Sequence, residues 1–138
     1  MIIKQLSVFM ENKSGRLTEI TRLLGESNIN ISAFSIADSS DYGILRMIVT
    51  EPETATDILK RNGFSVAVTE VLCLIIPHVP GSLFKALKIL SDNDVSIDYM
   101  YAFAMAEAAT VVIRTEPIQT AIDVLQQNKM QLLKSSEL

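Results

Sequence analysis

The chain of 138 residues carries the same sequence pattern twice, and this internal repeat limits its fold more than any other feature. Four segments of the first half recur in the same order in the second half, 66 positions later, or 65 for one of them, which indicates a duplication. Each copy has fewer than about 70 residues, a size at which a hydrophobic core is marginal. We therefore expect two modules, 1–70 and 71–138, that pack together and stabilise each other. The matching segments are 12–17 with 78–83, 28–31 with 94–97, 50–52 with 115–117 and 57–59 with 123–125.

In the first copy, apolar residues switch between the two-residue period of strands and the longer period of helices. Strand-like positions are Ile2, Leu6, Val8 and Met10, and helix-like positions are Leu17, Ile20 and Leu24. Ser14 is the expected N-cap of the first helix. The segment 50–53 predicts the start of a second helix, with Thr50 as its cap and Gly63 as its left-handed stop. Further strands are expected at 29–36, 44–49 and 64–71, with a hairpin loop at 38–43.

The second copy repeats this plan. Its inward strand positions are Leu72, Leu74 and Ile76, and its first helix has an apolar face of Leu83, Ala86, Leu87 and Leu90. The later elements are expected at 95–103, 109–115, 117–127 and 130–134, with a hairpin at 104–108. The predicted fold class is α+β, with two ferredoxin-like βαββαβ modules in tandem, each an antiparallel sheet with its helices on one face.

The first strand of the second copy is apolar on both of its faces. Val71, Cys73 and Ile75 stand where the first copy has Gln5, Ser7 and Phe9. A strand with two apolar faces is typical of one that is covered on both sides. Either a homodimer interface or the contact between the two copies would provide that cover, and we expect a homodimer.

Composition argues against several classes of function. The net charge of −4 is unfavourable for nucleic-acid binding. The single cysteine, Cys73, is expected to be a small buried apolar residue and has no disulfide partner in the chain. With one histidine, His78, and no phosphate-binding or metal-ligand motif, we expect neither an enzyme, nor a cofactor, nor a metal. The lack of an apolar run of about 18 residues and of a leader predicts a cytoplasmic protein without membrane contact.

Two other classes of βαββαβ protein fit the sequence less well. Acylphosphatase-like chemistry requires an arginine-containing loop after the first strand, and only Arg16 stands near that place. RNA-recognition modules require a basic surface and exposed aromatic residues on their central strands. The third strands, at 44–49 and 110–113, are aliphatic instead.

A strand that ends in Asn or Asp, an x-Pro-Gly-x-Leu loop that opens a helix, and an Asn-Ile pair that enters the next strand together resemble the ACT domain. The resemblance covers the whole chain as two tandem modules. It implies a regulatory protein that binds an amino acid between two modules and associates with a metabolic enzyme. The matching residues are Asn12, Gly15, Leu17, Asn30 and Ile31 in the first copy, and Pro80, Gly81, Leu83 and Ile97 in the second.

The loop before the first helix of each copy has a physical reason to bind a carboxylate. The first N–H groups of a helix lack intrahelical partners and carry positive dipole character. Gly15 and Gly81 allow close approach because they have no Cβ, and the amide of Asn12 can both donate and accept. The candidate ligand-binding residues are Asn12, Ser14, Gly15, Arg16, Leu17, Asn30, Ile31 and Ser32 in the first copy, and His78, Pro80, Gly81, Ser82, Leu83, Ser96, Ile97 and Asp98 in the second.

The two loops differ from each other and from the family pattern. Ser14 stands in place of the usual proline of the family, and His78 in place of its usual Asn or Asp. The resemblance implies that the loop of one copy meets the start of the second strand of the other. We expect the Asn12 loop to pair with 96–98 as the better polar site, and the His78 loop to pair with 30–32.

Each candidate residue also has a purely structural interpretation. These are a tight turn for Gly15 and Gly81, turn capping for Asn12 and Asn30, a core position for Leu17 and Leu83, and a solvated loop position for His78. Under these interpretations the chain is a ligand-free interaction scaffold or a regulatory subunit of a metabolic enzyme, which is the alternative function.

Overall fold

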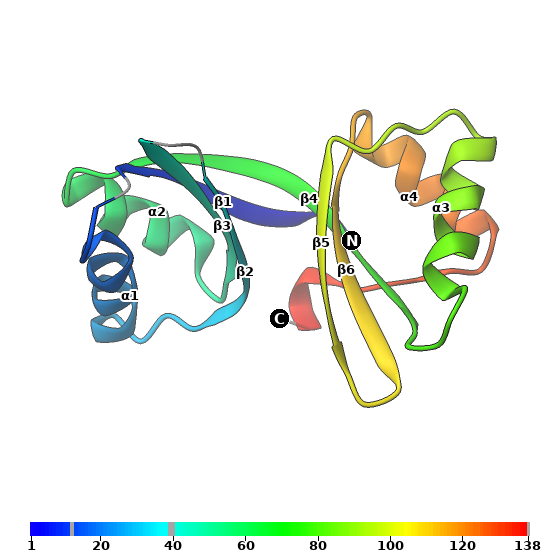
Figure 1. Cartoon of the computed structure of the whole chain (residues 1–138), viewed down its shortest axis with the longest axis horizontal. Helices are drawn as coiled ribbons and strands as arrows, with labels where there is room; N and C mark the ends of the chain where they lie inside the picture. Colours follow the sequence, from blue (N-terminus) through cyan, green and yellow to red (C-terminus); the bar gives the residue numbers. More distant parts are fainter. Residues whose placement is uncertain (12, 39–40, 138) are drawn as a thin grey trace. The chain divides into compact units, whose positions relative to one another are not determined.

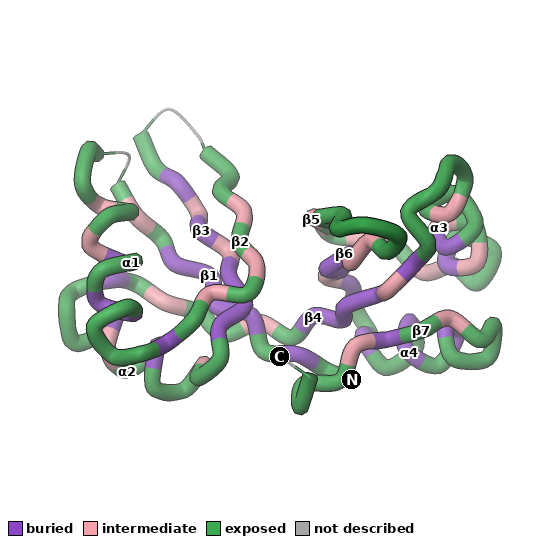
Figure 2. Tube along the Cα trace, turned by 90° about the horizontal axis from the view of Figure 1, so that it is seen from below, coloured by how far each residue is buried: buried purple, intermediate pink, exposed green. Residues whose placement is uncertain are grey.

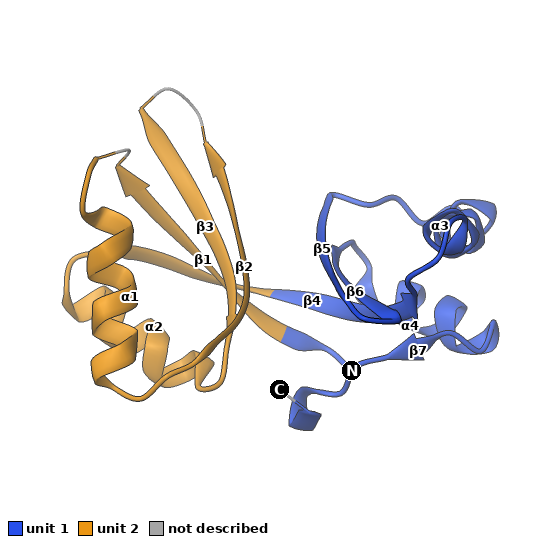
Figure 3. Ribbon diagram, turned by 60° about the horizontal axis from the view of Figure 1, so that its bottom comes forward, with its two compact units in different colours: residues 1–3, 70–137 blue, residues 4–69, 138 orange. Residues whose placement is uncertain are grey.

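The computed structural model describes residues 1–11, 13–38 and 41–137, and it divides into two compact units. We call residues 4–69 the N-terminal unit, and residues 70–137 together with 1–3 the C-terminal unit; Figure 3 shows them in orange and blue. Each unit has its own hydrophobic core.

The N-terminal unit has the strand order β2-β3-β1-β4, in which β3 pairs antiparallel with both β1 and β2. Helices α1 and α2 pack on one face of this sheet, and side chains of both helices join its core (Figure 1). The elements are β1 (Ile3–Glu11), α1 (Arg16–Glu26), β2 (Ile31–Asp38), β3 (Tyr42–Val49), α2 (Pro52–Arg61) and the first part of β4 (Ser65–Pro77).

The C-terminal unit has the strand order β5-β6-β4-β7, with antiparallel pairing throughout. Its helices α3 and α4 supply side chains to one core with the strands, as in the first unit. The elements are the second part of β4, α3 (Ser82–Asp92), β5 (Tyr99–Met105), β6 (Ala108–Arg114), α4 (Ile118–Gln127), β7 (Gln131–Leu132) and the short helix η1 (Ser135–Glu137).

The register of the strands carries the sequence repeat into three dimensions. Val8 pairs with Leu45 in the first unit, and the residues 66 positions later, Leu74 and Val111, pair in the second. The same holds for Ile36 with Leu45 and Ala102 with Val111. The predicted fold class, two ferredoxin-like modules in tandem, is confirmed.

The buried residues of the strands lie on β1, β3, β4, β6 and β7, whereas the described residues of β2 and β5 are half-buried or exposed (Figure 2). In the first unit, Leu6 and Val8 of β1 pack with Leu24 of α1 and Leu59 of α2. Full burial of an aliphatic side chain of this size stabilises a fold by about 1.5–3 kcal/mol. At the start of β1 the buried residue is Ile3 and not Ile2, which is 37% exposed.

The helix starts differ from the expected ones. Gly15, in the left-handed conformation, is the N-cap of α1, so the prediction of Ser14 is wrong. Glu51 is the N-cap of α2, with Pro52 in the first turn. Thr50, the predicted cap, instead accepts a hydrogen bond from the N–H of Asn30 at 3.1 Å. The left-handed stop at Gly63, with φ of +88°, is confirmed.

Several strands also differ from their predicted bounds, and the strand predicted at 130–134 is reduced to β7 at 131–132. The strand expected to end the first copy and the one expected to begin the second form a single strand, β4. No turn residue interrupts 65–77, so the chain continues extended from one unit into the next. The strand expected from residue 95 starts only at Tyr99, and 95–98 are irregular.

The prediction that this strand is covered on both faces is confirmed for β4. Val71 and Leu72 are fully buried, as are the neighbouring residues Cys73 and Leu74. Burial raises the pKa of the Cys73 thiol to about 12, in agreement with its predicted role as a small apolar residue. A single chain buries both faces of this segment, so its composition does not require a dimer.

Candidate functional site

The two loops between the first strand and the first helix of each unit have matching backbones. Gly15 has a φ of +90° and Gly81 a φ of +87°, and each is the N-cap of the helix that follows. This region of backbone space favours glycine, which explains both residues as turn requirements. A Cβ at either position would meet no atom within 4 Å, so both glycines also border open space.

The starts of α1 and α3 have no side-chain cap. A glycine N-cap has no side chain that could accept a hydrogen bond from the first turn. Ser82 donates its N–H to the carbonyl of Val79 at 3.2 Å, and the next N–H groups, of Leu83 and Phe84, belong to the turn that lacks intrahelical partners. These donors and the positive end of the helix dipole suit a carboxylate.

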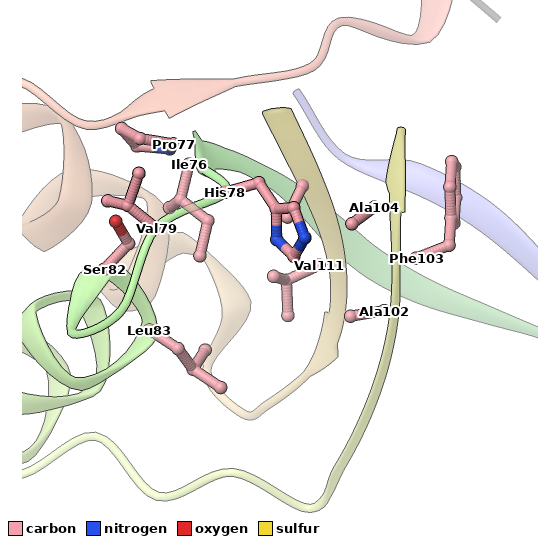
Figure 4. Close-up of a pocket in the computed structure, with 11 residues that line it drawn as sticks. Ile76, Pro77, His78, Val79, Ser82, Leu83, Ala102, Phe103, Ala104 and Val111 are labelled. Carbon is pink, nitrogen blue, oxygen red and sulfur yellow. The ribbon is translucent and has the colours of Figure 1, made fainter. Parts of the chain in front are cut away.

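A pocket of about 260 Å³ lies beside the start of α3, within the C-terminal unit (Figure 4). Loop residues lie on one side of it and the alanines of β5 on the other, with the imidazole of His78 between them. The backbone N–H of His78 donates to the carbonyl of Glu107 at 2.8 Å, which ties this loop to the β5–β6 turn. The lining residues are Ile76, Pro77, His78, Val79, Ser82, Leu83, Ala102, Phe103, Ala104, Ala109 and Val111.

The leucines that follow the two glycines are not core residues. Leu17 is 37% exposed and Leu83 is 38% exposed, so the core interpretation of both is wrong. They lie on the first helical turn, at the margin of the sheet, where the buried positions come only later with Ile20 and Ala86. Leu83 forms part of the pocket wall.

The first loop is more polar than the second. Lys13 Nζ lies 2.6 Å from a carboxylate oxygen of Glu11, and this hydrogen bond lowers the pKa of Glu11. Arg16 and Glu11 line a separate pocket of about 250 Å³, together with Phe9, Met10, Tyr42, Gly63, Phe64 and Ser65. Ser14 is exposed beside this loop. Asn12, the predicted amide ligand, lies outside the described residues.

Asn30 and Ser96, the candidate residues before the second strand of each copy, have a structural role. Thr50 accepts the N–H of Asn30 and donates its own N–H to the Asn30 carbonyl at 3.0 Å. Thr115, 65 positions after Thr50, donates its hydroxyl to the carbonyl of Ser96 at 2.5 Å. The repeated Thr-Glu-Pro tripeptide thus anchors the chain before β2 and before β5.

The structure brings together only part of the predicted site. His78, Ser82 and Leu83 share the pocket wall, whereas Pro80 and Gly81 are exposed residues of the same loop outside that wall. In the other candidate segments, Ile31 and Ile97 are half-buried, and Ser32 and Asp98 are exposed. The Asp98 carboxylate lies 4.0 Å from Arg114. The pairing of each loop with 30–32 or 96–98 of the other copy stays a prediction.

Sequence reasoning missed the β5 and β6 side of the pocket. Ala102 and Ala104 leave space there because their side chains are small. The first copy has the larger Ile36 and Asp38 at the equivalent positions. That substitution of small for large residues was visible in the repeat alignment. The effect of this substitution on the pocket is visible only in the structure, where this face of β5 lies opposite the loop before α3.

Other site types find no support in the described part of the chain. No group of three or more His, Cys, Asp or Glu side chains is placed to hold a metal there. Among the described helices, none has the length and apolarity needed to cross a membrane.

Comparison with known families gives a match that spans the chain. The family described as "ACT domain pair" matches residues 1–138. The chain belongs to the ACT domain pair family. ACT domain pairs are typical of regulatory modules that bind amino acids.

Solved structures agree with this assignment. Protein BT0572 from Bacteroides thetaiotaomicron is 50% identical, with a TM-score of 0.97 over 99% of this chain and 95% of that protein. The ligand-free regulatory subunit of aspartate kinase from Thermus thermophilus is 12% identical, with a TM-score of 0.69 over 90% of this chain and 91% of that subunit. At this identity the likeness concerns the fold alone. No curated protein matches the chain.

Proposed function

We propose that this ACT domain pair is a regulatory protein that binds a free amino acid at a strand–helix loop and passes its bound state to a metabolic enzyme. The observation that carries the proposal is the open pocket beside the uncapped start of α3. Family membership supports an amino acid as the ligand.

The loop chemistry supports recognition of the common part of an amino acid. The N–H groups at the start of α3 would receive the carboxylate, since they are unpaired donors at the positive end of a helix. The hydroxyl of Ser82 and the imidazole of His78 border the same pocket and can each donate or accept a hydrogen bond. The side chain of the ligand would then enter the pocket.

Regulation follows from differential affinity. An amino acid that binds one arrangement of the protein more tightly shifts the population toward it, by no more than that difference in affinity. A partner enzyme that recognises this arrangement would sense the concentration of the ligand. A homodimer stays part of the proposal, and light scattering at micromolar concentration tests it, with a monomer as the contrary result.

A thermal-shift screen with the twenty amino acids at millimolar concentration tests the proposal. A ligand at about 100 times its dissociation constant adds about 2.7 kcal/mol to the free energy of unfolding. For a chain of this size we expect the melting temperature to rise on the order of 5–10 °C. If none of the twenty produces a rise, the ligand-free scaffold becomes the better interpretation.

A further inference from the structure

We infer that the C-terminal unit alone accepts the ligand, that its pocket takes an apolar amino-acid side chain, and that the N-terminal unit closes the equivalent space with its own side chains. This inference rests on the proposed function. It goes further by naming the class of amino acid and the number of sites.

The walls of the C-terminal pocket are mainly apolar, with His78 and Ser82 as their polar side chains. None of its described lining residues is Asp, Glu, Lys or Arg. Ile76 and Val111 come from the central strands, and Leu83 comes from the first turn of α3. A charged side chain placed among these residues would lose part of its hydration without gaining an ion-pair partner, which is unfavourable. The pocket therefore selects apolar side chains.

The size of the pocket suits a metabolite. Its volume of about 260 Å³ is below the range of about 300–1,000 Å³ for pockets that take drug-sized molecules. Ala102 and Ala104 keep the β5 side of this space open, because each has only a methyl group. The pocket therefore suits an aliphatic or aromatic side chain of one amino acid.

The N-terminal counterpart of this pocket, the space over Gly43, is filled, and the N-terminal pocket beside Arg16 lies elsewhere, against Tyr42 and Phe64. Met10, Ile36 and Gly43 occupy the positions 66 residues before Ile76, Ala102 and Ala109. A Cβ built on Gly43 would lie 3.6 Å from Met10 Cε and 3.9 Å from Ile36 Cγ2. Both side chains thus reach the place above Gly43, which is buried, whereas Ala109 is only half-buried. The closure comes from side chains, since the strand registers of the two units are the same.

The test combines an amino-acid titration with two reciprocal variants. Isothermal titration of the full chain with leucine, isoleucine, valine, methionine, phenylalanine, lysine, aspartate and glutamate ranks the ligands and counts the sites. Ala102→Ile places in the C-terminal pocket the side chain that closes the N-terminal one. Ile36→Ala is the matched control, because it changes the equivalent position of the other unit.

We expect an apolar amino acid to bind with one site per chain. Ala102→Ile should weaken the affinity for this amino acid by about tenfold or more, because the larger isoleucine side chain would take up space that the ligand needs. Ile36→Ala should leave the affinity within about twofold of the parent value. Ala102 is exposed on an edge strand, where isoleucine is well tolerated, and an unchanged melting temperature of Ala102→Ile would verify its fold.

Three results would overturn the inference and leave the proposed function intact. These are tightest binding of lysine, aspartate or glutamate, two equivalent sites per chain, or an unchanged affinity in Ala102→Ile. If no amino acid of the full set of twenty binds, the proposed function fails and the inference fails with it.

Discussion

The two units have the same strand register and differ in the space over Gly43 and over the equivalent residue Ala109. In the N-terminal unit, Met10 and Ile36 fill the place over Gly43. In the C-terminal unit, Ala102 and its neighbours leave a pocket in the equivalent place. Duplication thus preserved the strand register, while a few substitutions on the edge strand decided which copy has room for a ligand.

The two threonines that bond to the segments before β2 and β5 also occupy equivalent backbone positions and differ in their side-chain environment. Thr50 bonds to Asn30, which directly precedes β2, and Thr115 bonds to the equivalent Ser96, in the irregular segment before β5. The hydroxyl of Thr50 accepts from an N–H and is exposed, whereas that of Thr115 donates to a carbonyl and is fully buried. We therefore expect equivalent residues to contribute differently to the free energy of unfolding where their burial differs.

The largest expected effect is on the two cores. Leu24 and Leu90 are equivalent helix residues, with exposed fractions of 0% and 1%. Leu24→Ala and Leu90→Ala should each lower the free energy of unfolding by about 2–5 kcal/mol, because each leaves a cavity in its core. Urea denaturation followed by circular dichroism measures both losses. A loss below about 1 kcal/mol in one variant would show that its unit repacks and that the cores are not equivalent.

The threonine anchors should differ in their contribution to stability. Thr115→Val leaves the Ser96 carbonyl without its buried donor and should cost about 1–3 kcal/mol. Thr50→Val removes an exposed acceptor, and water can replace it, so we expect a loss of about 0.5–1 kcal/mol. Thermal denaturation of the two variants side by side measures the difference. Equal losses would contradict the role assigned to burial.

The two glycine loops should respond alike. Gly15→Ala and Gly81→Ala should each lower the free energy of unfolding by about 1–2 kcal/mol, since a side chain disfavours the left-handed conformation and no atom clashes with the added Cβ. Chemical denaturation measures this loss. A markedly larger cost at one loop would indicate that the two backbones are not equivalent.

The smallest effect at neutral pH concerns the equivalent pair Ser7 and Cys73. Burial raises the pKa of Cys73 from its ordinary value of 9.0 to about 12, so the folded state favours the neutral thiol. This stabilising contribution is complete below about pH 9 and is lost as the pH rises toward 12. The free energy of unfolding of Cys73→Ser relative to the parent should therefore rise between pH 8 and 10.5, as measured by urea denaturation under reducing conditions.

Ser7→Ala is the control for this pH dependence. A serine hydroxyl does not ionise in the range, so the difference between this variant and the parent should stay constant. A constant difference for Cys73→Ser as well would mean that the thiolate is tolerated in the folded state.

Much of the fold was predictable because it depends on local patterns. The apolar alternation of β1, the helical spacing of α1 and the left-handed stop at Gly63 all act over a few residues. The capping errors at Ser14 and Thr50 have different causes. Gly15 takes the N-cap position of α1 because the chain is in the left-handed conformation there. The Thr50 hydroxyl binds the N–H of Asn30, a tertiary partner that local sequence does not reveal.

The candidate site was predictable in its loops and not in its walls. His78, Ser82 and Leu83 were recognised from the repeated loop sequence, and they do line a pocket. Ala102 has no polar group that would mark it as functional in a sequence. Its importance comes from its position across from Leu83, more than fifteen residues away along the chain.

The sequence by itself determined the duplication, the βαββαβ order and the two glycine turns, because periodicity and backbone conformation are local properties. Only the tertiary structure decided that Leu17 and Leu83 are half-exposed, that β4 runs unbroken from one unit into the next, and that one copy is open where the other is filled. Burial and free volume depend on side chains that meet across the fold, so no single segment of the sequence contains them.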